Sequence, residues 1–188
     1  ACGSSNSTDS AGAAEATEST AADGTVATDT SVVIGQSSEV ANLNPLIQPR
    51  TPDSNVQNMI FSYLVVPNEE LNYEGDLADS WDISADGTVS TFHLKEGVTW
   101  HDGEDFTADD VVFTLTSLAD PNYNGGADGR VMSIAGAADY QAGNADSVSG
   151  IKKVDDYTVE ITLESANAAF LSNMYTCILP KHILEGEN

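Results

Sequence analysis

The chain has 188 residues, with 30 acidic against 6 basic ones and a formal net charge of −24 at pH 7, which suits one domain, or one domain plus a tail, with a well-solvated surface. A surface this negative repels phosphate backbones, so the composition argues against nucleic-acid binding. The sequence contains no run of 18 apolar residues and therefore predicts no membrane-spanning helix.

The first 31 residues are predicted to form a disordered tether. Residues 3–31 consist almost entirely of Ser, Thr, Ala, Gly and acids, and they cannot bury enough apolar surface to offset the entropy lost on ordering. Ala1-Cys2-Gly3-Ser4-Ser5 resembles the end of a bacterial lipoprotein signal, in which the cysteine carries diacylglycerol. We therefore expect lipid on Cys2 and a folded region over 32–188. A plain N-terminal cysteine without lipid is the alternative.

The second cysteine, Cys177, lies in an apolar run that is typical of an inert buried thiol. Two cysteines of a secreted chain can pair, but a lipidated Cys2 is not available for a disulfide. We predict that the two cysteines do not pair.

The ordered part is predicted to begin with a short buried strand over residues 31–36. Asn44-Pro45 initiates a turn, and prolines stiffen the loop over 46–52. A helix capped by Asp53 or Ser54 should follow. Five apolar residues at helical spacing predict its buried face: Val56, Met59, Ile60, Tyr63 and Leu64. The run at 64–67 then predicts a strand.

Residues 80–115 hold the clearest local signals. Asp86-Gly87 predicts a tight turn between strands at 81–83 and 88–94, and Asp102-Gly103 predicts a second turn. Thr107 is the expected N-cap of a helix, with Asp110 completing a capping box. One buried helix face follows from the spacing of Val111, Val112, Leu115, Leu118 and Ala119.

The rest of the chain predicts short elements of both kinds. A helix is expected over 132–140, a second hairpin from 149–154 and 157–163 turned at Asp155-Asp156, and a helical turn over 167–174. Phe170 should point inward in that turn. Together these elements predict a mixed α/β fold.

No catalytic or metal-binding arrangement is evident. The three histidines, His93, His101 and His182, lack the spacing of a zinc site. His101-Asp102 suits an orienting pair or, more simply, a turn. Adjacent acids point in different directions on a helix or serve turns, so they make no acid/base pair by themselves. We therefore expect no metal, no cofactor and no enzymatic activity.

The central stretch also resembles a known family. Its motifs are Asp79-Ser80-Trp81, Ser84-x-Asp86-Gly87-Thr88, Phe92-x-Leu94-Lys95-x-Gly97-Val98, Trp100-His101-Asp102-Gly103 and 106–113, FTADDVVF. In this order and spacing they resemble the extracellular oligopeptide- and dipeptide-binding lipoproteins of ABC importers. Residues 177–182 resemble the same family, and the similarity runs from about residue 31 to the end of the chain.

The resemblance implies a fold and a function. It implies the first lobe of a two-lobed, periplasmic-binding-protein-like fold, here a truncated one, because only the first part of such a protein is covered. By their offset from Leu43-Asn44-Pro45, residues Pro49, Arg50 and Thr51 would face the ligand. Arg50 would meet a peptide carboxylate, or equally remain a solvated loop arginine.

The implied partners are an extended peptide, an ABC permease and the membrane, through the lipid anchor. The protein would be an extracytoplasmic monomer. Half of a two-lobed site should bind peptides weakly, and an unpaired strand edge or apolar patch should be exposed. Alternatives are another solute (nickel, haem, sugar or signalling peptide), an acidic surface interaction domain, or a secreted hydrolase.

Overall fold

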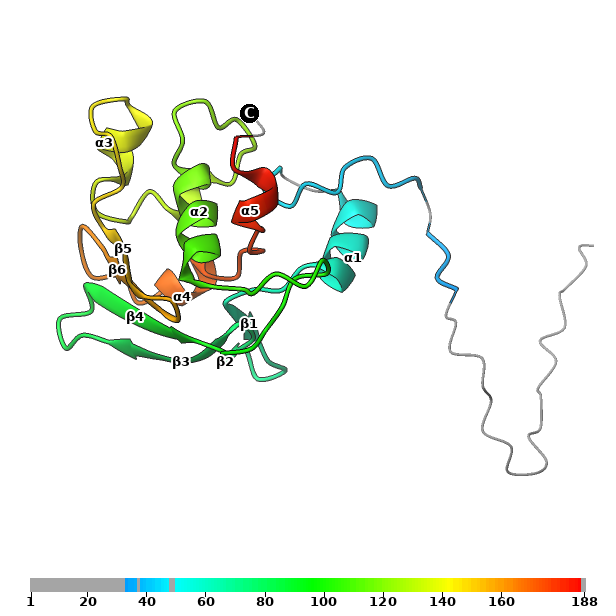
Figure 1. Ribbon diagram of the computed structural model, residues 1–188, viewed down its shortest axis with the longest axis horizontal. Coiled ribbons are helices and arrows are strands. Elements are labelled where there is room, and N and C mark those ends of the chain that lie inside the picture. The colour runs from blue at the N-terminus through cyan, green and yellow to red at the C-terminus, as the bar shows by residue number, and fades with distance from the viewer. Residues whose placement is uncertain (1–32, 37, 48–49, 187–188) are drawn as a thin grey trace, which may run out of the picture. The chain divides into compact units, whose positions relative to one another are not determined.

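The computed structural model describes residues 33–36, 38–47 and 50–186, and it divides the chain into two units, 1–35 and 36–188 (Figure 1). The predicted tether, Cys2 and Pro49 lie outside the described residues. The predicted buried strand over 31–36 is wrong in its described part. Residues 33–36 form no strand, and Val33 is 96% exposed. An apolar run needs a neighbouring strand to be buried, and the described residues provide none that pairs with it.

The second unit is built around a four-stranded antiparallel sheet in the order β3-β4-β6-β5. Its strands are β3 (Ala78–Ile83), β4 (Val89–Leu94), β5 (Ile151–Asp155) and β6 (Thr158–Thr162). Phe92 pairs with Val159 and Ser90 with Ile161, and all four are buried, so they form one covered face. Both predicted hairpins are confirmed, the second with its turn at residues 156–157.

Helix α2 (Ala108–Leu118) covers this face and packs against β5 and β6 (Figure 1). The capping box is confirmed: the Asp109 N–H donates to the Thr107 hydroxyl at 3.3 Å, and the Thr107 N–H donates to the Asp110 carboxylate at 2.9 Å. The predicted helix face is also largely confirmed, because Val111 and Leu115 are almost fully buried.

A second, two-stranded sheet joins β1 (Val65–Pro67) to β2 (Tyr73–Gly75). The C-terminal segment returns beside it, since the Ile178 N–H donates to the Ser62 carbonyl at 3.0 Å. The Tyr63 and Tyr175 rings stack there, 4.3 Å apart. Long-range pairing, rather than local propensity, therefore holds the end of the chain in place.

The remaining elements are short: η1 (Asp128–Arg130), α3 (Ala137–Gln141), α4 (Phe170–Asn173) and α5 (Lys181–Leu184). The helix predicted over 132–140 forms only as α3. Phe170 is buried as predicted. Cys177 is a buried free thiol as expected, and its burial raises its pKa. No helix among the described residues has the length and apolar character needed to cross a membrane.

Helix α1 (Thr51–Ile60) corrects two predictions. It begins before Asp53, with Arg50 as the N-cap, and ends at Ile60, so the predicted apolar stripe is not one helix face. Met59 is 61% and Ile60 41% exposed, whereas Tyr63 and Leu64 are buried as predicted but lie beyond the helix. The buried positions are instead polar, Asp53 and Gln57, because both side chains bind the backbone of the preceding loop.

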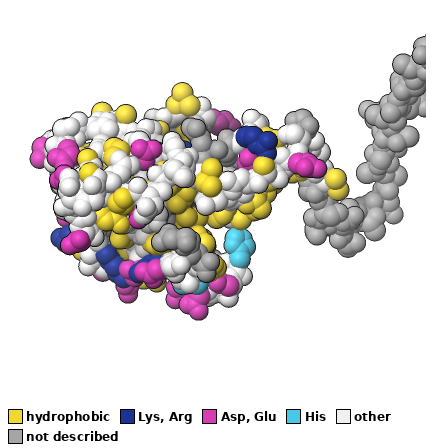
Figure 2. Space-filling model, turned by 90° about the horizontal axis from the view of Figure 1, so that it is seen from above, with side chains coloured by type: hydrophobic (Ala, Val, Ile, Leu, Met, Phe, Trp, Pro, Cys, Tyr) yellow, Lys and Arg dark blue, Asp and Glu magenta, His cyan; other side chains and the backbone are white. Residues whose placement is uncertain are grey.

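An exposed apolar patch lies at the C-terminal end of α1 and on α5. Ile60, Phe61, Trp100 and Ile183 border a hollow of about 150 Å³ there. Such a patch was expected for this chain. Figure 2 shows hydrophobic side chains gathered over the middle of one side of the described region, with acidic ones toward its edges.

Candidate ligand-binding groove

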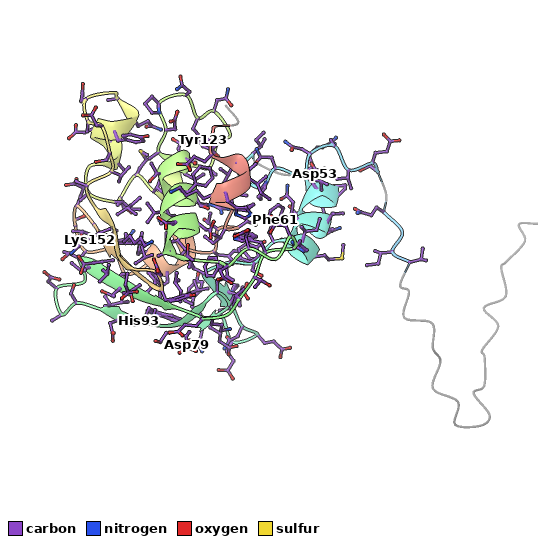
Figure 3. All side chains as sticks on the ribbon, in the orientation of Figure 1. Asp53, Phe61, Asp79, His93, Tyr123 and Lys152 are labelled. Atoms are coloured by element: carbon purple, nitrogen blue, oxygen red, sulfur yellow. The ribbon has the colours of Figure 1, made fainter. Side chains whose placement is uncertain are left out.

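A groove of about 470 Å³ lies beside the loop that was predicted to face the ligand. Its walls are the 44–47 turn, the last turn of α2, the loop over 120–125, Tyr140 and the end of the chain from 184 to 186. Figure 3 shows Tyr123 above the C-terminal end of α2, and Asp53 on α1. Segments that are far apart in the sequence therefore build one concave surface.

The Asp53 carboxylate holds the first wall in place. It accepts the N–H groups of Ala41 at 2.7 Å, Asn42 at 3.3 Å and Arg50 at 3.1 Å. These donors favour the charged form, and the Ala41 N–H contributes most to lowering the pKa of Asp53. One buried side chain on α1 thus fixes both ends of the 41–50 segment.

Two further contacts shape the turn itself. The Gln57 side-chain amide donates to the Asn42 carbonyl at 3.2 Å. The predicted Asn44-Pro45 turn is confirmed, because the Ile47 N–H donates to the Asn44 carbonyl at 3.2 Å. The Asn44 side chain also accepts the Leu46 N–H at 3.0 Å. The turn therefore presents Leu46 and Ile47 to the groove in a fixed backbone conformation.

The second wall is tied to the first through Tyr123. Its hydroxyl donates to the Leu46 carbonyl and accepts the Ala127 N–H at 3.0 Å. Burial raises the pKa of Tyr123, so the phenol keeps the proton that it donates. Gly125 passes so close that a Cβ would lie 2.6 Å from the Tyr123 hydroxyl, and closer still to the Leu46 carbonyl. Only glycine fits this contact.

The predicted site residues that the structure describes, Arg50 and Thr51, follow the 44–47 turn in the chain but are not part of the groove walls. Arg50 is the N-cap of α1, with an exposed side chain whose Nε is 3.5 Å from the Asp53 carboxylate. Thr51 opens the helix and is exposed. Neither lines the groove, and Pro49 lies outside the described residues. Their ligand contact stays a prediction. Sequence reasoning recognised 120–126 as a loop but missed that it faces the 44–47 turn.

A separate polar cluster organises the region between α2 and α5. The Asp110 carboxylate accepts the Trp100 indole N–H at 3.2 Å and the Lys181 N–H at 2.8 Å, besides its capping bond. His182 lies 2.8 Å from the Asp102 carboxylate, which raises the pKa of the imidazole. The turn role of Asp102 was predicted, but its histidine partner is His182 and not the adjacent His101.

A larger hollow of about 890 Å³ lies against the sheet and is lined by Asp79, His93, Lys95 and the 155–158 turn. Figure 3 shows Asp79 and His93 along the sheet, away from α2. The His93 imidazole is 3.2 Å from the exposed Asp82 carboxylate. The described residues contain no group of three or more His, Cys, Asp or Glu side chains placed to hold a metal ion.

A family model described as bacterial extracellular solute-binding proteins, family 5 middle region, matches residues 72–185. The chain belongs to this family. Among its family 5 relatives, it is 30% identical over 155 residues to the oligopeptide-binding protein AppA of Bacillus subtilis. It is 35% identical over 135 residues to the periplasmic oligopeptide-binding protein OppA of Salmonella typhimurium. These matches cover 81% and 70% of this chain but only 26% and 25% of the relatives. The chain therefore spans about a quarter of their length.

Solved structures confirm the predicted fold class, a mixed α/β chain similar to periplasmic-binding-protein folds. Listeria monocytogenes OppA bound to peptide matches with a TM-score of 0.70 at 25% identity, over 81% of this chain and 31% of that one. NikZ of Campylobacter jejuni, in complex with Ni(L-His), matches with a TM-score of 0.66 at 33% identity, over 79% and 27%. The AppA and OppA relatives are named for the solutes that they bind, not for reactions.

Proposed function

We propose that this family 5 chain forms part of the ligand-binding lobe of an oligopeptide-binding protein that serves an ABC permease. The observation that carries the proposal is the groove between the 44–47 turn and the 120–125 loop, beside the segment predicted to face the ligand. Its walls are fixed before any ligand arrives, because Asp53 and Tyr123 hold both loops by hydrogen bonds. Such preorganisation reduces the entropy lost on binding.

The groove suits a ligand recognised mainly through its main chain. Leu46, Ile47 and Phe113 offer apolar surface along the groove. The Arg50 N–H already donates to Asp53, so it is not free to pair with a peptide, and the Arg50 carbonyl already accepts the Ser54 N–H. Thr51, as the first helical residue, has an N–H with no intrahelical partner. We assign to it the main-chain contact with a ligand carbonyl, and to the exposed Arg50 guanidinium a contact with a carboxylate.

The proposal also places the protein outside the cytoplasm. Diacylglycerol on Cys2 would anchor the chain by two acyl chains, as stable attachment requires. The closed, ligand-bound protein would then meet the permease as a monomer. Mass spectrometry of protein from its native membrane tests the anchor: an unmodified Cys2 would contradict this part of the proposal and leave peptide binding untouched.

A second candidate is a different solute. NikZ was solved with Ni(L-His), and the chain is 37% identical over 109 residues to heme-binding protein A of Haemophilus influenzae. Both similarities favour a metal chelate or haem as alternative cargo for the same groove.

Titration of the 188-residue chain by NMR with tri- to pentapeptides tests the main proposal. We expect millimolar affinity, because these 188 residues span only about a quarter of the length of the relatives, and shifts confined to residues 44–51 and 113–125. Ile47→Ser should weaken binding, since Ile47 lines the groove and is 42% exposed, whereas Leu71→Ser, at an 82% exposed turn position, should not. Shifts produced only by Ni(L-His) or haem would replace peptide as the cargo. Micromolar peptide binding would contradict the half-site argument.

A further inference from the structure

The charged side chains of the groove all have one sign. Among the described residues that line it, Asp120 and Glu185 are acidic and none is Lys or Arg. Arg130 in η1 is already engaged, since it donates to the Tyr175 carbonyl at 3.0 Å and to the Thr176 hydroxyl at 2.9 Å. A ligand entering the groove therefore meets negative charge.

Asp120 is the better placed of the two acids. It is partly buried directly after α2, and it binds only the N–H and side-chain amide of Asn122, at 2.7 and 3.1 Å. Its carboxylate has no cationic partner among the described residues. The last turn of α2 has no basic residue either, so the negative end of the helix dipole adds to the Asp120 charge.

Glu185 is only loosely neutralised. Its carboxylate is 3.8 Å from the Lys181 ammonium, which is also 3.9 Å from Asp109 on α2. One lysine shared between two carboxylates leaves net negative charge at this rim of the groove. Lys181 is therefore not a substitute for a cation inside the groove.

The same groove is lined by three aromatic rings, Phe113, Tyr123 and Tyr140. The faces of such rings attract ammonium and guanidinium groups, and the alkyl stem of a lysine or arginine packs on apolar surface. Leu46 and Leu184 supply that surface in the groove. Acidic rims with aromatic and aliphatic walls suit a long basic side chain better than a hydrophobic or acidic one.

We propose that the groove selects peptides with a lysine or arginine side chain, which it binds with the cationic head at Asp120. This inference rests on the proposed peptide-binding function and adds the substrate class. The overall acidity of the protein does not explain it, because charges farther away than about 8 Å are largely screened at physiological salt.

The experiment compares three acetylated, amidated tripeptides, Ala-Lys-Ala, Ala-norleucine-Ala and Ala-Glu-Ala, by NMR titration at physiological salt. Norleucine keeps the length of lysine without its charge, and the blocked termini leave the side chain as the only ionic group. We expect the lysine peptide to bind most tightly and to shift residues 113–125. Equal affinity for all three would overturn the inference and leave peptide binding intact. No binding by any of them would also overturn the inference, and the proposed function would be contradicted only if unblocked peptides failed to bind as well.

Two variants test whether Asp120 is the residue that favours the lysine peptide. Asp120→Asn should weaken the lysine peptide by about two- to fivefold, the range of a partly exposed ion pair, and leave the norleucine peptide unchanged. Glu69→Gln removes one acid from the exposed β1–β2 turn, outside the groove, and should change neither affinity. An equal loss in both variants would show a general charge effect and overturn the assignment. If magnesium chloride alone shifts the NMR signals of Asp120 as the lysine peptide does, the groove holds an inorganic cation site instead.

Discussion

Asp110→Asn should be among the most destabilising substitutions of a charged residue in this protein. The side chain is 4% exposed, and its two oxygens accept three N–H groups from three segments: Thr107, Trp100 and Lys181. It therefore caps α2, holds the loop before it and fixes the start of α5. An asparagine in either orientation turns an NH₂ group toward at least one of these donors.

The magnitude follows from those contacts. A hydrogen bond to a charged group contributes about 1.5–3 kcal/mol and a neutral one about 0.5–1.5, so losing one bond and weakening two gives roughly 3 kcal/mol after allowing for non-additivity. For a domain of this size that corresponds to a fall in Tm of about 6–12 °C.

Asp109→Asn is the matched control, because it removes the neighbouring acid from the same helix turn. Asp109 is 46% exposed and pairs with Lys153 at 2.6 Å, a surface ion pair that contributes about 1 kcal/mol or less. Calorimetric melting of both variants tests the reasoning. If Asp110→Asn melts within about 2 °C of Asp109→Asn, the three-segment role of Asp110 is refuted.

Three further predictions concern the loops. The pKa of His182 is raised in the folded protein, so its contact with Asp102 stabilises the fold fully below the ordinary histidine pKa. This stabilisation is lost as pH rises through the raised pKa. His182→Gln should therefore remove this part of the pH dependence of Tm. Gly125→Ala should shift the groove amides and destabilise by about 1–3 kcal/mol in urea unfolding, whereas Gly129→Ala, with open space around it, should do neither. Asp53→Asn should speed hydrogen exchange of the amides at 41 and 42. In the unmutated protein, exchange of these amides should become faster only as pH falls through the lowered pKa of Asp53. If exchange in Asp53→Asn equals that of the unmutated protein, the role of Asp53 in holding this segment is contradicted.

Features whose causes lie within a few residues could be predicted from the sequence. The α2 cap needs only Thr107 and Asp110, and the first hairpin turns where Gly87 takes a φ of 70°. The alternation in β6 places Val159 and Ile161 inward because successive strand residues face opposite sides. The motifs of residues 79–113 indicated the family because they encode these same local structures.

Helix α1 shows why hydrophobic spacing failed elsewhere. The apolar stripe through Met59 and Ile60 predicted a core face, but the helix buries Asp53 and Gln57. Those side chains are needed to satisfy backbone groups of the 41–44 segment, and buried polar groups must be paired. Periodicity counts apolar residues, so it cannot detect a helix face whose partner is a loop backbone.

The groove depends on a contact that no local pattern encodes. The hydrogen bond from Tyr123 to the Leu46 carbonyl joins positions 77 residues apart, and the phenol must stay neutral to donate it. The phenol is neutral at neutral pH in any case, and the burial that raises its pKa extends this hydrogen bond to more alkaline pH. The acids of the chain then divide by location. Asp53 is consumed by backbone N–H groups and Asp110 by two backbone N–H groups and an indole N–H, whereas Asp120 lies at a concave surface without a cationic partner among the described residues. The net charge of −24 therefore does not by itself indicate which ligand the protein binds. The fold is needed to show which carboxylates remain available to contact a ligand.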